Sequence, residues 1–167
     1  MNDVILYNES DVATDDAALA RAVQLTLAHH GSQVRARGEV TILLTSDERV
    51  RSLNREYRAV DSVTDVLSFP ALQHGLSEEP PALGDLVVAM PWTARQARHS
   101  GMALMDCLCL LMVHGTLHLL GHSHETPEAR ARMWALQDDL LRRLGLAPEL
   151  VPRLEGDSMY QPPAGAP

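Results

Sequence analysis

Three histidines in the second half of the chain have the spacing of metal ligands. The stretch HGTLHLLGHSH places His114, His118 and His124 in the pattern H-x-x-x-H-x-x-G-x-x-H. On a helix, residues four apart project from the same face, so the first two imidazoles would lie together. Gly121 allows the chain to leave the helix and turn back, so that His124 can join them. Three nitrogen ligands with an open fourth position are typical of a catalytic zinc site. We therefore predict one zinc ion per chain.

The same stretch leaves alternatives to this ligand set. His122 lies in the turn and could compete with His124, although the spacing favours His124. The histidines could also be core or surface residues without a metal, but three at this spacing on an apolar helix favour the metal. Glu125 could orient a ligand, although a carboxylate there also suits the first turn of the next helix.

The residue after the first histidine excludes one class of enzyme. Zinc proteases with this histidine spacing carry a glutamate at that position, and it acts as their general base. This chain has Gly115 instead. Zinc can also polarise a phosphoryl oxygen or lower the pKa of a bound water to about 7, and neither effect needs that glutamate. The pattern therefore predicts a metal site that is not a peptidase.

The other elements of the chain must bring these residues together. Apolar and β-branched runs predict strands at 4–7, 40–45, 66–69 and 83–90. Helical periodicity predicts helices at 15–30, 46–57, after Pro91, at 102–120 and at 125–144. The expected N-caps are Thr14, Ser46 and Thr126.

This order predicts an α+β fold, layered in the α/β manner. It has a single small mixed β-sheet of about four strands, flanked by about five helices. The metal site lies at the end of a buried central helix. Residues 1–147 are expected to form one domain, and residues 148–167, rich in Pro, Gly and Ala, a disordered tail. The apolar segment 102–120 is not expected to enter a membrane, because Asp106 and the histidines would be costly in lipid.

Charge and cysteine content restrict the partners and the compartment. The net charge of −8 argues against a protein that coats nucleic acid by bulk attraction. Four arginines nevertheless fall in one short segment and form either a local basic groove or a solvated helix face: Arg49, Arg51, Arg55 and Arg58. Cys107 and Cys109 do not face each other on a helix, so we expect two buried thiols in a reducing cytoplasm.

Three motifs in the chain resemble those of the bacterial YbeY family of single-strand-specific endoribonucleases. The histidine stretch is one, approximately H-G-x-L-H-L-x-G-[YH]-D-H in the family. Residues 53–69 correspond to L-N-x-x-[YF]-R-x-x-D-x-x-T-D-V-L-S-F, and residues 84–88 to G-D-[IL]-x-[IV]. The resemblance runs from about residue 40 to residue 140. Ser123 departs from it, because the family usually has an aspartate there.

The resemblance implies a mixed sheet flanked by helices, zinc bound by the three histidines, and Arg58 in the active cleft as a catalytic residue. It implies a zinc-dependent endoribonuclease of the cytoplasm that matures the 3′ end of 16S rRNA and serves ribosome quality control. Its partners would be single-stranded RNA, ribosomal RNA and small ribosomal subunit proteins. A cationic group beside a zinc also suits the charge that develops on a phosphodiester. The alternatives are a small-molecule metallohydrolase and a non-catalytic ribosome-assembly factor with a zinc-stabilised fold.

Two chemical roles stay open at this point. Asp65 and Asp85 are either carboxylates of the cleft or strand-end groups that bond to the backbone. The nucleophile is either water or the neighbouring 2′-hydroxyl of the RNA. We favour water, because an open position on the zinc gives it a place and a suitable acidity.

Overall fold

The computed structural model describes residues 3–29, 38–71 and 82–147. Its elements in chain order are β1 (Val4–Asn8), α1 (Asp16–His29), β2 (Glu39–Thr45), α2 (Asp47–Arg58), β3 (Val66–Pro70), β4 (Ala82–Ala89), α3 (Met90–Ser100), α4 (Leu104–Leu119) and α5 (Pro127–Arg143). The α+β fold predicted from the sequence is therefore confirmed over these ranges. The predicted tail at 148–167 lies outside the described residues.

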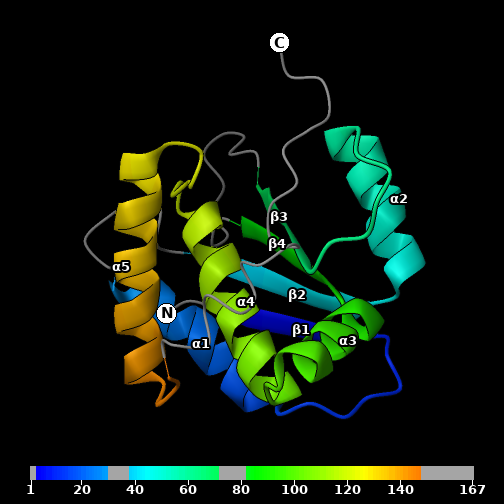
Figure 1. The fold of residues 1–167 in the computed structure, drawn as a ribbon, viewed down its shortest axis with the longest axis horizontal. Coiled ribbons are helices and arrows are strands. Elements are labelled where there is room, and N and C mark those ends of the chain that lie inside the picture. Colours follow the sequence, from blue (N-terminus) through cyan, green and yellow to red (C-terminus); the bar gives the residue numbers. More distant parts are fainter. Residues whose placement is uncertain (1–2, 30–37, 72–81, 148–167) are drawn as a thin grey trace.

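The four strands form one mixed sheet in the order β1-β2-β4-β3. β1, β2 and β4 are parallel, whereas β3 runs antiparallel to β4. Side chains alternate between the two faces, as the strand period requires. Ile42 and Leu86 belong to a large core with α1, α4 and α5, and Leu67 and Val87 to a smaller core under α2. Figure 1 shows α4 beside α5, with α2 standing apart from both.

Helix α4 is the predicted buried central helix. Twelve of its residues are buried, which explains why its sequence is almost entirely apolar. Among the described residues, no single helix is long and apolar enough to cross a bilayer, and only α3 and α4 together, bent by 115°, reach that length and composition. Cys107 and Cys109 are free and buried, as predicted. Burial raises the pKa of both thiols to about 11.

The helix caps mostly follow the sequence. Ser46 and Thr126 accept hydrogen bonds from the backbone of the first turns of α2 and α5, as predicted. The predicted cap of α1 is wrong by one residue. Asp15 caps this helix, because its carboxylate accepts a hydrogen bond of 3.0 Å from the amide of Ala18. Thr14 instead bonds to another side chain. A carboxylate at this position is also favoured by the positive end of the helix dipole.

Candidate metal centre

The end of α4 and the turn after it bring the three predicted ligands together. His114 and His118 lie on the last turns of the helix. Gly121 has φ of 91°, a conformation that glycine adopts without strain. The Gly121 amide bonds to the His118 carbonyl and the His122 amide to that of Leu117, which closes the helix end. The ends of α2 and α4 and the start of α5 lie at the same end of the molecule (Figure 1).

The imidazoles of His114, His118 and His124 form a compact cluster. One nitrogen from each lies within 4.8 Å of the other two. The Nε2 atoms of His114 and His118 are only 3.0 Å apart. Of the described residues, the predicted ligands are the set that could hold a metal in this way. His122 is not part of it, so the structure favours His124 over His122 as the third member.

Hydrogen bonds fix which nitrogen of each helical histidine faces the cluster. Nδ1 of His118 donates to the carbonyl of His122 at 2.9 Å, since a carbonyl only accepts. Nδ1 of His114 donates to Oε1 of Gln137, also at 2.9 Å. A neutral imidazole carries one proton, so both Nε2 atoms present lone pairs to each other. Two ligand nitrogens on one tetrahedral zinc would lie about 3.3 Å apart, from metal–nitrogen distances of about 2.0–2.1 Å. The residues therefore fit a metal ion.

The histidines are neutral, which is the form that binds metal. Burial, with a smaller effect of His118, lowers the pKa of His114 to about 3. Burial lowers the pKa of His118 to about 4, and the charges of His124 and Arg58 contribute. Burial also lowers the pKa of His124.

Helix α5 supports the cluster with three residues that the sequence analysis missed. Gln137 orients His114, as described above. The Arg130 guanidinium donates to the His124 carbonyl at 3.3 and 3.4 Å. The Trp134 ring lies with its centroid 5.4 Å from that of His124 and 6.0 Å from that of His114. These residues are four and three positions apart, so they share one helix face. The spacing of these three residues, on the helix that follows the ligand turn, is the feature of the sequence that could have indicated their role.

A cavity of about 350 Å³ opens beside the histidines. Arg58 lines it with them, and its Nη2 donates to the carbonyl of Ser68 at 3.2 Å. The other three arginines of the predicted basic segment do not line this cavity. Arg51 instead makes two hydrogen bonds to Asp61, and Arg55 lies 3.9 Å from the same carboxylate. Of the two interpretations of the segment, the solvated helix face holds for these two residues, whereas Arg58 reaches the site.

The three acidic residues singled out in the sequence differ in whether they line the cavity. Asp65 is buried, with 2% of its surface exposed, and lines the cavity. Asp85 is exposed and does not line it. Glu125 lines the cavity but precedes the cap of α5, so the interpretation as a first-turn charge is wrong. Glu128 holds that place.

Other motif residues shape the frame of the site. Asn54 is buried and donates to the carbonyl of Ser62 at 2.9 Å, which holds the connection between α2 and β3. Gly84 has φ of 145°, and a Cβ there would lie 2.3 Å from the carbonyl oxygen of Phe69. Only glycine therefore allows β3 and β4 to approach at this point.

Gly115 occupies the position of the protease base and is closely packed against the sheet. A Cβ at this position would lie 2.8 Å from Leu86 Cδ2 and 3.2 Å from Ser68 Oγ. The Ser68 hydroxyl also donates to the Gly115 carbonyl at 3.2 Å. The helix is packed against the sheet here, so any side chain at position 115 requires Leu86 or Ser68 to move. This packing therefore disfavours a glutamate beside the first ligand.

Comparison with known proteins gives the family. A family model described as Endoribonuclease YbeY matches residues 5–145. The chain belongs to the YbeY family. The Endoribonuclease YbeY of Geobacillus kaustophilus is 39% identical over 142 residues, which cover 81% of this chain and 87% of the relative. That of Bacillus velezensis is 35% identical over 148 residues, 84% of this chain and 94% of the relative. The resemblance seen in the three motifs is thereby confirmed.

A solved structure supports the fold. The solution structure of a protein from Thermotoga maritima superposes with a TM-score of 0.53 and covers 96% of this chain and all of its own. Its sequence is only 19% identical, so the likeness concerns the fold alone. The YbeY-family assignment rests on the sequence matches, and the three clustered histidines are consistent with a metal site in this member.

Proposed function

We propose that this YbeY-family protein is a zinc-dependent endoribonuclease that cuts single-stranded RNA. His114, His118 and His124 are the metal ligands, and Arg58 is the catalytic residue that holds the scissile phosphate. One observation carries the proposal: two lone pairs face each other at 3.0 Å in a cavity that Arg58 also lines. Zinc suits a site of three imidazoles with a fourth position open to substrate or water.

The residues of the chain prepare this chemistry before substrate arrives. When bound, the zinc would polarise a phosphoryl oxygen and lower the pKa of a water to about 7. Gln137 and the His122 carbonyl keep the two Nε2 atoms aimed at one point. The Ser68 carbonyl anchors one Nη of Arg58. A guanidinium has five N–H donors, so others are available for the non-bridging oxygens of a phosphate.

The proton of the nucleophile needs an acceptor. Among the described residues that line the cavity, Asp65 and Glu125 carry carboxylates and are the candidates for this acceptor.

Water as the nucleophile leaves product ends without a cyclic phosphate, whereas the 2′-hydroxyl leaves a 2′,3′-cyclic phosphate. We favour water. A cyclic end, with full resistance of RNA that has 2′-deoxyribose at the cut, would establish the 2′-hydroxyl instead.

The cellular role follows from the family resemblance. We propose maturation of the 3′ end of 16S rRNA and ribosome quality control in the cytoplasm, with small ribosomal subunit proteins as partners. We also propose that residues 1–147 act as one endoribonuclease domain.

A cleavage assay tests the function directly. Purified protein is incubated with end-labelled single-stranded RNA spanning the 16S 3′ end, and with the same RNA in a duplex. We expect cleavage of the single strand, loss of cleavage with a chelator, and recovery with added zinc. Hydrolysis of bis-p-nitrophenyl phosphate without RNA cleavage would indicate a small-molecule metallohydrolase. Binding of the RNA without any cleavage would indicate an assembly factor.

A further inference from the structure

One edge of the sheet borders the cavity. β3 is the outermost strand on one side of the sheet, next to β4 (Figure 1). Three alternate residues of this strand line the cavity beside the histidines: Val66, Ser68 and Pro70. Alternate side chains of a strand lie on the same face. These three lie on the face that packs on α4, because the Ser68 hydroxyl donates to the Gly115 carbonyl of that helix.

The main chain of these three residues points away from the sheet. In an antiparallel pair, the residues of a strand alternate between those that bond to the partner strand and those that do not. The Ala89 amide donates to the Asp65 carbonyl at 3.0 Å, and the register between β3 and β4 has no break. The odd-numbered residues of β3 therefore bond to β4, and the even-numbered ones direct their N–H and C=O groups to the free edge. The bond from Arg58 Nη2 to the Ser68 carbonyl agrees with this direction.

This free edge carries two available donors. Among the described residues, the amide N–H groups of Val66 and Ser68 have no hydrogen-bond acceptor. Pro70 has no N–H to donate, and a proline on an edge strand commonly occupies such a position. The Ser68 carbonyl already accepts from the Arg58 guanidinium. The edge therefore offers two N–H donors and a cation, and its central acceptor is occupied.

We propose that the main-chain N–H groups of Val66 and Ser68 bind two successive phosphates of the RNA strand. The inference rests on the proposed function and extends it to a phosphate-binding strand edge. The Ser68 N–H shares the scissile phosphate with Arg58, because the guanidinium bonds to the same residue. The Val66 N–H lies two residues away, about 7 Å along the strand, and holds the neighbouring phosphate.

The edge suits a polyanion better than a peptide strand. A peptide that extends a sheet needs donors and acceptors in alternation along the edge. Here Pro70 cannot donate and the Ser68 carbonyl is occupied, so the pairing would be interrupted at both residues. Phosphate oxygens only accept, and they bond well to main-chain N–H groups and to guanidinium. Asp65 and Glu125 also line the cavity, so a phosphate can bind only where donors face it.

Val4 provides a matched control at the other edge of the sheet. Like Val66, it directly follows an aspartate. The Asp3 carbonyl accepts from the Val40 amide at 2.9 Å, just as the Asp65 carbonyl accepts from the neighbouring strand. Val4 therefore directs its own N–H away from the sheet. β1 and β3 are opposite edges, and Val4 does not line the cavity.

The test removes one N–H without changing a side chain. α-Hydroxyisovaleric acid, introduced at position 66 by in vitro translation, replaces the amide of Val66 by an ester. Affinity of the metal-loaded protein for a single-stranded 2′-O-methyl oligonucleotide is then measured by fluorescence anisotropy. The ester at position 66 should weaken binding by about 10- to 150-fold, the range for a hydrogen bond to a charged group. The same ester at position 4 weakens the preceding carbonyl equally, and it should bind as wild type.

Proline substitutions repeat the test with ordinary residues. Val66→Pro removes the same N–H, so it should lose as much affinity as the ester, whereas Val66→Ala keeps the N–H and should lose less. Ser68→Pro and Ser68→Ala make the same comparison for the second donor. Melting temperatures show which variants are folded, and the ester decides the question if Val66→Pro is not.

A modified oligonucleotide identifies the phosphate. A methylphosphonate replaces one phosphate at a time and removes its charge. At one position, wild type and the position-4 ester should lose affinity, whereas the position-66 ester should lose little more, because its contact is already absent.

Three results would overturn the inference: wild-type affinity in the position-66 ester, equal losses in both esters, or additive losses at every phosphate. The first would leave the edge as a site for a peptide strand. Absence of cleavage by wild type would instead overturn the proposed function, and the anisotropy series would still decide whether this edge binds the strand.

Discussion

The Nε2 atoms of His114 and His118 face each other at 3.0 Å, and each ring donates its Nδ1 proton to an oxygen outside the cluster. Two acceptors at this distance repel unless a cation lies between them. The α4 helix sets the approach by its four-residue spacing, whereas Gln137 and the His122 carbonyl set the direction of the lone pairs. The two lone pairs are therefore directed at one point between the rings, where a bound cation would accept both.

Removal of single histidines should identify the ligands. His114→Ala should lose most of the metal, because one of three ligands disappears. His122→Ala should keep it, because the hydrogen bond from His118 goes to the backbone carbonyl of residue 122, which alanine retains. Elemental analysis of the purified variants measures this, with about one zinc per chain in wild type as the reference. A metal-free His122→Ala together with a metal-loaded His114→Ala would refute the ligand assignment.

Gln137 should control metal affinity although it touches no metal. It is buried, with 1% of its surface exposed, and its Oε1 accepts a hydrogen bond from the Nδ1–H of His114. Gln137→Leu removes this acceptor and should weaken zinc binding by about 10- to 100-fold. Gln137→Glu keeps an acceptor and adds negative charge, so it should bind zinc at least as tightly as wild type. Competition with a chromophoric chelator gives the affinities.

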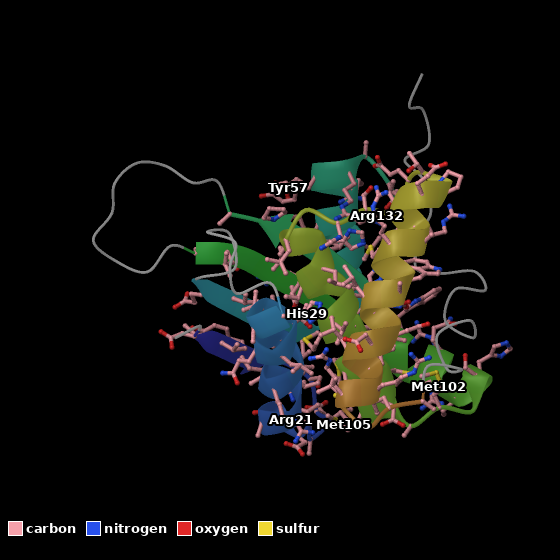
Figure 2. All side chains as sticks on the ribbon, turned by 90° about the vertical axis from the view of Figure 1, so that its left-hand side faces the viewer. Arg21, His29, Tyr57, Met102, Met105 and Arg132 are labelled. Atoms are coloured by element: carbon pink, nitrogen blue, oxygen red, sulfur yellow. The ribbon has the colours of Figure 1, made fainter. Side chains whose placement is uncertain are left out.

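The control for Gln137 lies on the same helix. Arg132 is exposed on α5 (Figure 2), so Arg132→Leu should leave zinc affinity unchanged. Equal affinities in wild type and Gln137→Leu would mean that the orientation of His114 does not depend on this hydrogen bond.

Reversal of the charge at Arg58 should abolish RNA cleavage and spare the fold. Arg58→Glu places a carboxylate where the phosphate must bind, and we expect a loss of kcat/KM of at least about 100-fold. Zinc content and melting temperature should stay at wild-type values, because the side chain is exposed. Arg49→Glu is the control, since Arg49 is exposed at the other end of α2 and does not line the cavity. Wild-type cleavage by a folded Arg58→Glu protein would make Arg58 an ordinary surface residue.

The parts of the fold that follow from local rules were predictable from the sequence. Alternating strands and helices, the caps at Ser46 and Thr126 and the turn at Gly121 each follow from the properties of a few neighbouring residues. The sequence predicts the cap of α1 one residue too early, because Thr14 and Asp15 are both good N-caps and the sequence alone does not rank them.

The hydrogen-bond partners of the histidines are harder to predict from the sequence. Gln137 lies 23 positions after His114 in the chain, on the next helix. Their hydrogen bond therefore depends on how α4 and α5 pack. The acceptor for His118 is a backbone carbonyl, and its direction follows from the turn and not from the type of residue at position 122. Arg58 was singled out only through the family motif, because the charge pattern alone did not separate it from the other arginines of the segment.

Gly115→Ala should destabilise the protein, although alanine is the better helix former. Helix propensity alone favours the change by about 1 kcal/mol. A Cβ at this position, however, would lie 2.8 Å from Leu86 Cδ2. Overpacking of this kind costs about 1–3 kcal/mol, so we expect a net loss in the free energy of unfolding of up to about 2 kcal/mol. Urea unfolding of the wild type and the variant measures the difference.

A second substitution tests the cause of that loss. Leu86→Val shortens the side chain that the new Cβ would meet, so Gly115→Ala should cost less in this background than in wild type. The coupling free energy from the four proteins isolates the contact between positions 86 and 115. If Gly115→Ala is as stable as wild type and shows no coupling to Leu86→Val, then Leu86 rotates away without cost. In that case steric exclusion at position 115 would no longer account for the missing protease base.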